Sequence, residues 1–212
     1  MYAKYLKRLL DIILSLLALT VLSPVMILLY ILVRIKLGSP VIFRQNRVGK
    51  NEKIFTMYKF RSMTNEKDAE GNLLPDSERT TSLGRFLRSS SLDELPELIN
   101  ILKGDLSIVG PRPLLVEYLP YYSDYERKRH NVRGGLTQPE VLYDKVFPSW
   151  DEQLEYEAYY AENITFATDL KIIIKTIKII FGRCSSNYGG KTRESLIAER
   201  EKVHPAEVSD LR

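Results

Sequence analysis

Hydrophobic and polar positions divide the chain into one long apolar segment and a mixed, more charged remainder. Residues 12–33 contain no charged side chain, and about 20 residues of helix cross the hydrocarbon core of a bilayer. Arg34 and Lys36 follow this segment closely, whereas a cleavable signal peptide has a shorter apolar centre and small residues at its cleavage site. We therefore expect residues 1–36 to form a membrane helix that the mature protein retains.

A Ser23-Pro24 pair interrupts this apolar segment. Proline removes one backbone hydrogen bond and kinks a helix, and the Ser23 hydroxyl can satisfy a carbonyl that is freed. Basic residues stand on both sides of the segment: Lys4, Lys7 and Arg8 before it, and Arg34, Lys36, Arg44 and Arg47 after it. Because basic flanks stay in the cytosol, the pattern favours a re-entrant helix that enters the membrane, bends at Pro24 and returns. A straight or slightly kinked helix that spans the bilayer is the alternative.

Beyond residue 36 the pattern changes to shorter elements. Residues 41–45 and 54–59 are β-prone, and a Gly-Lys-Asn-Glu sequence at residues 49–52 separates them. This arrangement predicts a small β-hairpin. The polar residues 64–82 predict a surface loop.

Two later segments have the spacing of helices. In residues 91–102 leucines and an isoleucine recur at helical intervals, and Ser91 with Glu94 matches a capping box that would start the helix at Ser91. Residues 169–181 carry lysines on one face and isoleucines over the rest. That pattern is typical of an amphipathic helix in the headgroup region of a membrane, or of a surface helix packed on the core. We therefore expect a mostly helical α+β fold with a small β-hairpin and amphipathic interfacial helices.

Composition narrows the class of protein. With 212 residues and 44% hydrophobic content, the chain suits one domain with a buried core. A single cysteine, Cys184, excludes an intramolecular disulfide and a thiolate zinc cluster and is typical of a reducing compartment. The net charge of +4 is compatible with nucleic acid, anionic lipid or phosphorylated substrates. Because the basic residues are dispersed and one basic flank enters the membrane, nucleic-acid binding ranks last.

The Asp93-Glu94 pair is the first candidate for chemistry. A helix macrodipole stabilises carboxylates at the helix start, which would leave Asp93 a good anion for a metal or a nucleophile. Acidic residues at a helix start are, on their own, ordinary surface charges. The nearby cations change this interpretation: Arg85 and Arg88 upstream, Lys59 and Arg61 on the predicted hairpin, and Arg112 in a Gly-Pro-Arg-Pro turn. Carboxylates, several cations and a divalent ion are what phosphoryl transfer needs.

Other residues and motifs give weaker indications of catalysis or of metal binding. His130 follows an Arg-Lys-Arg run, and a lone histidine in a basic run is more often structural or exposed than catalytic. We leave it out of the mechanism. The sequence contains no glycine-rich phosphate loop, dinucleotide fingerprint or paired-histidine metal motif. ATPases, dehydrogenases and zinc hydrolases therefore lack support.

Four blocks of the sequence resemble a known family: residues 43–49, 58–63, 88–95 and 104–113. In order and spacing they are similar to the bacterial sugar transferases. The length and the single N-terminal apolar segment resemble, more narrowly, the small monotopic phosphoglycosyl transferases. The resemblance implies a Mg²⁺-dependent reaction that moves a sugar 1-phosphate from a UDP-sugar to polyprenyl (undecaprenyl) phosphate and releases UMP. This reaction is the first membrane-committed step of glycan assembly.

The resemblance also implies roles for individual residues. Asp93 would be the nucleophile that forms a covalent phosphosugar intermediate, and a ligand of the metal. Glu94 would be its dyad partner near the metal and the acceptor. Lys59, Arg88 and Arg112 match basic positions that lie near phosphates, in agreement with the charge argument.

The resemblance implies an organisation in the membrane as well. We expect a re-entrant helix over residues 1–36 that bends at Ser23 and Pro24, a cytosol-facing catalytic domain over residues 37–182 and a polar tail over residues 183–212. The partners are a UDP-sugar donor, the polyprenyl phosphate acceptor and membrane lipid, with a homodimer as an option. The expected location is the cytosolic face of the bacterial inner membrane.

One region departs from the family pattern. In residues 134–145 only Gly135 and Thr137 match cleanly, and Lys145 stands where the family has arginine. We place Lys145 in the substrate-binding set. Glu157 similarly occupies a usual aspartate position. If this region shapes the sugar or nucleotide pocket, the donor differs from the common ones while the chemistry stays the same.

Two other functions remain as alternatives. A membrane-anchored scaffold of a glycan assembly complex would use the basic membrane flank without catalysis. A glycosyltransferase that passes the sugar alone would release UDP instead of UMP. The sequence names neither the sugar nor the length of the polyprenol.

Overall fold

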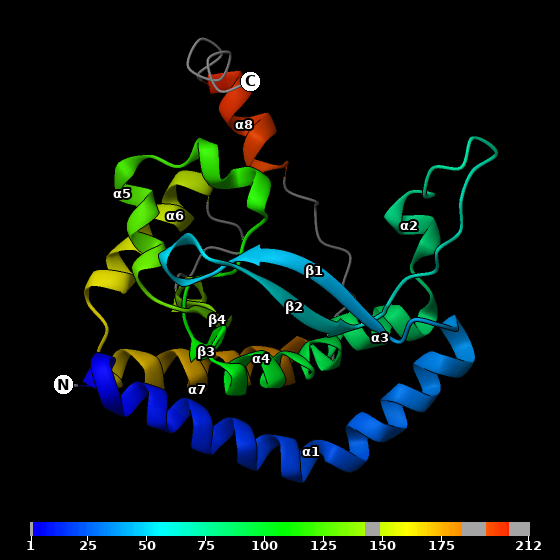
Figure 1. Cartoon of the computed structure of the whole chain (residues 1–212), viewed down its shortest axis with the longest axis horizontal. Helices are drawn as coiled ribbons and strands as arrows, with labels where there is room; N and C mark the ends of the chain where they lie inside the picture. The colour runs from blue at the N-terminus through cyan, green and yellow to red at the C-terminus, as the bar shows by residue number, and fades with distance from the viewer. Residues whose placement is uncertain (1, 143–148, 184–193, 204–212) are drawn as a thin grey trace.

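The computed structural model describes residues 2–142, 149–183 and 194–203. In Figure 1 a long bent helix, α1 (Lys7–Leu37), lies beneath the rest of the molecule, and a β-hairpin crosses the middle of the view above it. The hairpin consists of β1 (Ile42–Val48) and β2 (Ile54–Phe60), as the sequence predicts. The remaining elements follow in chain order: α2 (Asp76–Arg79), α3 (Ser82–Ser89), η3 (Leu92–Glu94), α4 (Glu97–Lys103), β3 (Leu106–Val109), η4 (Val116–Tyr121), α5 (Asp124–Arg127), η5 (Lys128–Asn131), β4 (Gly134–Thr137), η6 (Pro139–Leu142), α6 (Trp150–Glu162), α7 (Phe166–Arg183) and α8 (Leu196–Val203). Two short helical turns, η1 (Tyr2–Leu6) and η2 (Lys50–Glu52), complete them.

The bend of α1 has a local cause. Pro24 lies inside the helix, which bends near its middle in Figure 1. The Ser23 hydroxyl donates to the Thr20 carbonyl at 2.8 Å, and Thr20 is the residue whose carbonyl an amide at position 24 would otherwise bind. The prediction that Ser23 satisfies the freed carbonyl is therefore confirmed.

The N-terminal arm of α1 is held by polar contacts. Lys7 Nζ lies 2.6 Å from an Asp169 carboxylate oxygen on α7. The buried Asp11 accepts hydrogen bonds from the Ser107 hydroxyl at 3.0 Å and from the Ile108 amide at 2.9 Å. These contacts satisfy a carboxylate that would be costly to bury alone. They also fix the rotation of this arm against β3.

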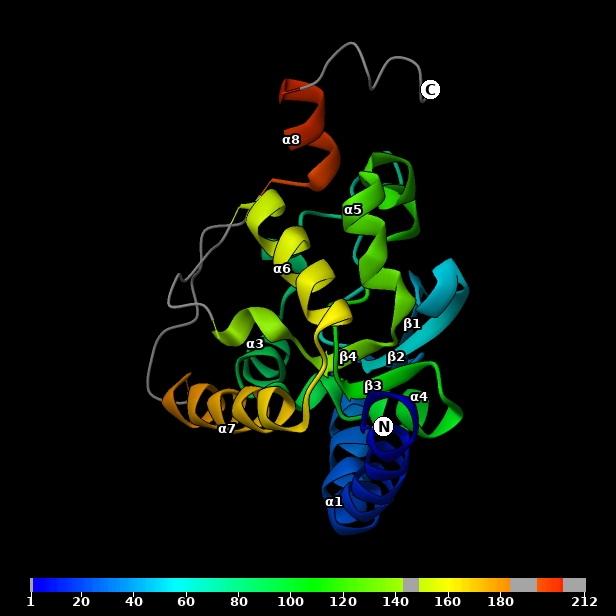
Figure 2. The same cartoon turned by 90° about the vertical axis from the view of Figure 1, so that its left-hand side faces the viewer.

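The C-terminal arm of α1 is held by apolar packing. Leu29 and Val33 are buried in one cluster with Val41, Phe60 and Leu87, so this arm rests on the base of the hairpin and on α3. Both arms of the bent helix therefore contact the same domain. Figure 2 shows α1 and α7 together at the lower side of the molecule, with α8 at the opposite end.

Within the described ranges, the helix Tyr2–Leu37 is the one stretch long and apolar enough to cross a membrane, judged by length and composition alone. Its mean hydropathy is 2.7, and only 11% of its most apolar window is buried. The exposed remainder is an apolar surface that the domain leaves uncovered.

Asn100 on α4 attaches the hairpin to the helical layer. Its side chain accepts from the Tyr58 amide at 3.1 Å and donates to the Thr56 carbonyl at 2.8 Å. The unpaired edge of β2 is thereby satisfied by a fully buried side chain. Lys59, the next residue along β2, is positioned by the same contacts.

A second, parallel pair joins β3 to β4 and sets the turn that carries Arg112. A Cβ atom on Gly135 would stand 2.1 Å from the Gly110 amide nitrogen, so the two backbones meet more closely than any side chain allows. The Gly135 amide donates to the Pro111 carbonyl at 2.9 Å. Gly135 is thus needed to hold the turn at residues 110–113.

The predicted capping box at Ser91 is wrong. Ser91 has a φ of 57° and makes no side-chain capping bond, and the first full α-helical residue is Glu97. A capping box requires an extended N-cap residue, which the left-handed Ser91 is not. Residues 92–94 form a single tight turn before Pro96 instead.

The predicted tail contains one described helix, α8. Leu196 is buried against Trp150 and Tyr118, and the Arg200 guanidinium lies 2.5 Å from Glu126. These contacts dock α8 onto η4 and α5.

Candidate active site

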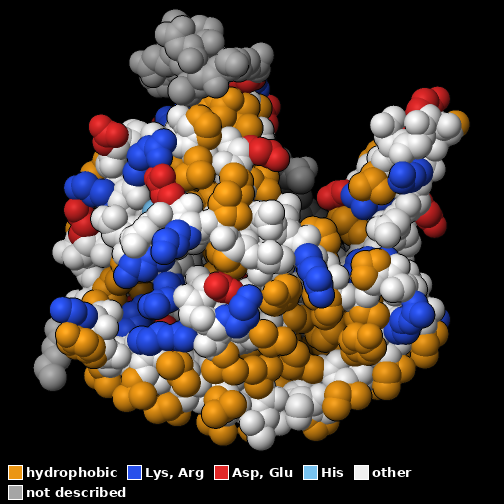
Figure 3. Space-filling view, viewed as in Figure 1, with side chains coloured by type: hydrophobic (Ala, Val, Ile, Leu, Met, Phe, Trp, Pro, Cys, Tyr) orange, Lys and Arg blue, Asp and Glu red, His pale blue; other side chains and the backbone are white. Residues whose placement is uncertain are grey.

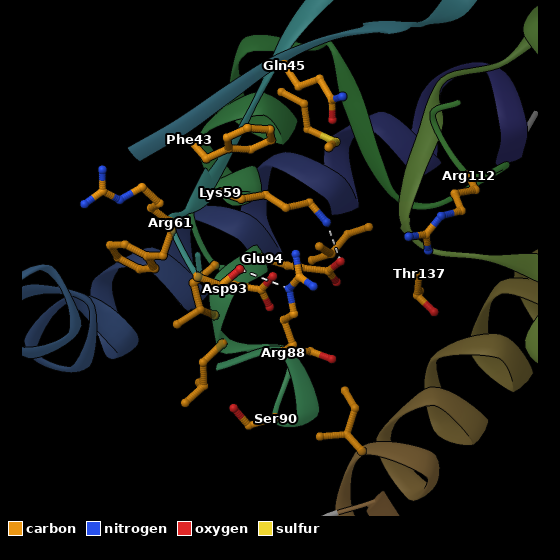
Figure 4. Close-up of a pocket in the computed structure, with 18 of the residues that line it drawn as sticks. Phe43, Gln45, Lys59, Arg61, Arg88, Ser90, Asp93, Glu94, Arg112 and Thr137 are labelled. Atoms are coloured by element: carbon orange, nitrogen blue, oxygen red, sulfur yellow. Dashed lines mark hydrogen bonds and ion pairs between the residues drawn. The ribbon is translucent and has the colours of Figure 1, made fainter. Parts of the chain in front are cut away.

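One large cavity, of about 1060 Å³, opens between the hairpin, η3, the turn before η4 and α7. Five of the predicted site residues line it: Lys59, Arg88, Asp93, Glu94 and Arg112. Figure 4 shows these side chains converging from three directions. The sixth, Lys145, lies outside the described residues, so its role stays a prediction.

Asp93 is the most unusual carboxylate in the cavity. The tight turn of η3 presents it at the cavity wall with 9% of its surface exposed. Burial raises the pKa of Asp93 to about 6, and the neighbouring Glu94 adds to the rise, while Lys59 and Arg88 oppose it. The predicted stabilisation of this anion by a helix start is wrong, because Asp93 lies in a separate turn and α4 begins only at Glu97. Burial is the largest cause of its raised pKa.

Lys59 binds two carboxylates at once. Its Nζ lies 2.6 Å from Glu94 Oε1 and 3.1 Å from Glu97 Oε1. Burial alone would lower the pKa of Lys59, but Glu97 and then Glu94 outweigh that effect and raise it. Lys59 is consequently a firmly charged ammonium next to Asp93.

Glu97 is a site residue that the sequence interpretation missed. It is 3% exposed, and burial raises its pKa to about 7, with Lys59 opposing the rise and Glu94 adding to it. Its contact with Lys59 is close, but the Oε1 atom is not aligned for a hydrogen bond. The sequence carries no signal for this inward position, because an acidic residue in a first helical turn is usually exposed.

Arg88 comes from the last turn of α3. Its Nε donates to the Ser62 hydroxyl at 3.0 Å, and in Figure 4 the side chain points toward Asp93 and Glu94. Arginine in this position can bind a phosphate oxygen next to the two carboxylates.

Arg112 is positioned through its backbone. Its amide donates to Glu157 Oε1 at 3.1 Å, and its carbonyl accepts from the Arg129 guanidinium at 2.5 Å. Arg129 and Glu157 are both buried and pair at 2.6 Å. Held in this way, Arg112 extends its side chain into the cavity (Figure 4). The Arg129–Glu157 pair was not predicted as a support of the site.

His130 does not line this cavity. Burial lowers its pKa to about 3, and Arg129 and Arg127 lower it further. Its ring packs on Tyr122 with centroids 5.3 Å apart. A neutral, packed imidazole agrees with leaving it out of the mechanism.

The region that departs from the family pattern forms part of the cavity wall. Thr137, Gln138 and Val141 line the cavity, and the Thr137 hydroxyl is hydrogen-bonded to that of Thr176 on α7. These side chains contribute hydroxyl, amide and apolar groups beside the charged centre. The prediction that they select the donor stays a prediction.

Within the described parts of the chain, no group of three or more His, Cys, Asp or Glu residues is arranged to hold a metal ion. Asp93 and Glu94 are the carboxylates that line the charged end of the cavity beside Lys59. Magnesium is commonly bound by one or two carboxylates together with substrate phosphates, so two carboxylates are a sufficient set.

Comparison with known proteins shows which family the chain belongs to. The model of the family described as bacterial sugar transferase matches residues 2–183. The chain is 46% identical over 173 residues to the uncharacterized sugar transferase EpsL of Bacillus subtilis, covering 82% of this chain and 86% of that protein.

Two further relatives have more specific names. The undecaprenyl-phosphate galactose phosphotransferase of Salmonella typhimurium is 35% identical over 85% of this chain, and the chain spans 41% of its length. The UDP-N-acetylgalactosamine-undecaprenyl-phosphate N-acetylgalactosaminephosphotransferase of Aeromonas hydrophila is 34% identical over 83% of this chain, which spans 44% of its length. The chain therefore belongs to the bacterial sugar transferase family and is a transferase.

Proposed function

We propose that this protein transfers a sugar 1-phosphate from a UDP-sugar to polyprenyl phosphate and releases UMP, through a covalent intermediate on Asp93. The observation that carries the proposal is the position of Asp93, a carboxylate at the wall of a large cavity, near Lys59 and Arg88 and in the same cavity as Arg112. Two relatives are named as phosphotransferases that act on undecaprenyl phosphate, which supports the class of acceptor.

The first step exchanges one bond at phosphorus. An oxygen of the Asp93 carboxylate attacks the β-phosphorus of the donor, the one bonded to the sugar. The bond from this phosphorus to the bridging oxygen breaks, and UMP leaves with the electron pair. Lys59, Arg88 and Arg112 spread the negative charge that develops on the phosphate oxygens.

The second step returns the enzyme to its starting state. An oxygen of the polyprenyl phosphate attacks the same phosphorus, the bond to Asp93 breaks and the carboxylate is restored. The cavity is also lined by apolar side chains, which suit an isoprenoid chain beside a charged headgroup site: Leu92, Leu95, Leu136, Ile173, Ile177 and Ile180. Because the carrier stays in the membrane, the charged centre must lie at the depth of its phosphate.

Asp93 and Glu94 would hold the magnesium ion that the family resemblance implies, together with the donor's phosphates. Bound there, the ion would neutralise charge on the diphosphate and stabilise the leaving group. Burial raises the pKa values of Asp93 and Glu97 although Lys59, Arg88 and Arg112 oppose the rise, so a divalent cation bound here would further stabilise the ionised carboxylates.

The bend of α1 supports a re-entrant topology. Its N-terminal arm binds α7 and β3 through Lys7 and Asp11, and its C-terminal arm packs on the hairpin through Leu29 and Val33. A helix that crossed the bilayer would place one of these ends on the far side, away from the domain. The contacts of both arms with one domain therefore favour two ends on the cytosolic side.

The distribution of apolar and basic side chains on the surface supports insertion into one leaflet of the membrane. In Figure 3 a band of hydrophobic side chains runs along the lower edge over α1, and Lys and Arg side chains lie above it. Exposed apolar residues of α7 add to this surface: Phe166, Leu170, Ile174 and Ile177. We assign this face to the cytosolic leaflet of the inner membrane, with the lysines of α7 at the headgroups.

A panel of UDP-sugars with polyprenyl phosphate and Mg²⁺ tests the reaction. Release of UMP with a phosphosugar lipid supports the proposal. Release of UDP would replace it with a glycosyltransferase, and no turnover with any donor would favour the scaffold.

Topology is tested separately by thiol labelling of intact cells. With Cys184 replaced, single cysteines at Tyr2 and Gly38 should both resist an impermeant reagent, because both face the cytosol. Labelling at position 2 alone would establish a spanning helix. Replacing Pro24 with alanine should increase that labelling, because the bend loses its cause.

A further inference from the structure

The inner face of the β-hairpin lines the cavity, and the mechanism assigns it no role beyond Lys59. Side chains of alternate residues on both strands point into the cavity: Phe43, Gln45 and Arg47 from β1, and Met57 and Lys59 from β2. Phe43 lies opposite Lys59 in the register and Gln45 opposite Met57. The motif at residues 43–49 therefore places an aromatic ring and an amide beside the charged centre.

Phe43 and Gln45 lie at successive positions along β1, progressively farther from the reacting phosphorus. Gln45 follows Phe43 on the same face by two residues, which is about 7 Å of strand. In Figure 4 the order from Asp93 is Lys59, then Phe43, then Gln45. A donor with its phosphates at Lys59 would extend its nucleoside toward Phe43 and Gln45.

The orientation of the Gln45 amide is fixed by its neighbour. Arg47 Nη2 lies 2.6 Å from Gln45 Oε1, and because a guanidinium only donates, the atom that it contacts must be the amide oxygen. Arg47 is itself anchored, since its Nη1 donates to the Pro113 carbonyl at 3.3 Å. The amide nitrogen of Gln45, for which the described residues provide no hydrogen-bond acceptor, is left as a donor toward the cavity.

We infer that Phe43 and Gln45 form the subsite for the donor's nucleobase and that Gln45 selects uracil over cytosine. This inference rests on the proposed function for the identity of the donor class. The exposed ring of Phe43, with 44% of its surface accessible, offers a stacking platform to a flat base. The amide nitrogen of Gln45 donates to the O4 carbonyl of uracil, where cytosine carries an amino group that is itself a donor.

The inference predicts a preference in binding that needs no catalysis. The full chain in lipid nanodiscs is titrated with UMP and with CMP by calorimetry, without acceptor. UMP should bind at least about fivefold more tightly than CMP, the lower end of what a paired base edge contributes. Equal affinities for the two nucleotides would overturn the inference.

Two variants test separately the hydrogen bond to the edge of the base and the stacking on its face. Gln45→Glu removes the donor and supplies an acceptor, so the UMP preference should vanish or reverse. Phe43→Leu should weaken both nucleotides alike, by about fivefold or more, because stacking does not distinguish the bases. Asn46→Asp makes the matching amide-to-acid change on the next residue, which does not line the cavity, and should leave the ratio unchanged.

Three controls exclude misfolding and catalysis as causes of a changed preference. Each variant is accepted only if its thermal transition matches the wild type, and Gln45→Leu serves as a second variant, with the preference expected to fall toward one. A ratio unchanged in both Gln45 variants would contradict the inference. Repeating the titration in Asp93→Asn should preserve the preference for UMP, so that a failure of the covalent mechanism is distinguishable from a failure of the base subsite.

Discussion

Two clusters of buried charge in this protein differ in how well their charges are matched. Around Lys59, which pairs with Glu94 and Glu97, the pKa values of Asp93 and Glu97 are raised to about 6 and about 7, in both cases chiefly by burial, so the nearby cations compensate these carboxylates incompletely. Around Arg129, the Glu157 carboxylate pairs directly with the guanidinium, and both groups are fully enclosed and hydrogen-bonded to each other and to the backbone of Arg112. A second buried carboxylate, Glu140, lies near this pair, and burial together with Glu157 raises its pKa to about 8.

The cluster around Lys59 is suited to a reaction, whereas the cluster around Arg129 is suited to holding the structure in place. An unbalanced carboxylate at the wall of a cavity is ready to bind a cation or an electrophilic phosphorus, at a cost in stability. A matched buried pair does no chemistry but breaks expensively when one partner is removed. In this protein the matched Arg129–Glu157 pair fixes the backbone of Arg112, and through it one wall of the unbalanced site.

The largest expected effect is on catalysis. Asp93→Asn keeps the shape of the side chain but removes the attacking charge, so turnover should fall by at least about a thousandfold. UMP release from donor alone should be lost together with it. Asp124→Asn, an exposed acid in the first turn of α5, is the control and should keep wild-type turnover. A residual rate within tenfold of wild type would remove Asp93 from the role of nucleophile.

The next effect is on stability and concerns the matched pair. Glu157→Gln removes the carboxylate that is hydrogen-bonded to the buried Arg129 guanidinium, which should lower the free energy of unfolding by about 3–5 kcal/mol. Glu162→Gln on the same helix breaks an exposed pair with Lys128 and should change the stability far less, because water and salt screen an exposed pair. Thermal unfolding of both variants in nanodiscs checks the difference. Equal losses would show that burial of the pair does not matter.

A smaller effect of opposite sign is expected at Asp93 in metal-free buffer. Its pKa is about 6 in the folded protein against 3.8 as its ordinary value, so the folded state loses stability as the pH rises through that window. Asp93→Asn removes this loss and should be more stable than wild type at pH 8 by at most about 3 kcal/mol. The advantage should shrink toward pH 4, where wild-type Asp93 is protonated. A variant less stable than wild type at pH 8 would mean that the charge of Asp93 is well compensated.

Local features of the fold could be predicted from the sequence, whereas long-range pairs could not. The hairpin and the roles of Ser23 and Pro24 follow from neighbours in the chain, and structure and sequence agree on them. Ser91 and Glu94 match the sequence pattern of a capping box, but the left-handed backbone of Ser91 does not form the cap. Arg129 and Glu157 pair across 28 positions, which no local pattern indicates.

The candidate site shows the same division. The family resemblance pointed to Lys59, Arg88, Asp93, Glu94 and Arg112, and all five line one cavity. The sequence could not indicate that Glu97 turns inward to share Lys59, because an acidic residue in a first helical turn is usually exposed. Nor could it show the burial that raises the pKa of Asp93, since burial depends on the packing of distant elements.

The most direct test of the covalent mechanism is mass spectrometry of the protein mixed with UDP-sugar and Mg²⁺ in the absence of acceptor. We expect a sugar-phosphate mass on the peptide that contains Asp93, formed together with one equivalent of UMP and discharged when polyprenyl phosphate is added. Asp93→Asn should show neither product, and chelation of the metal should prevent both. If no adduct forms within a single turnover, and the kinetics require both substrates to be bound together, the lipid phosphate attacks the donor directly and Asp93 is not the nucleophile.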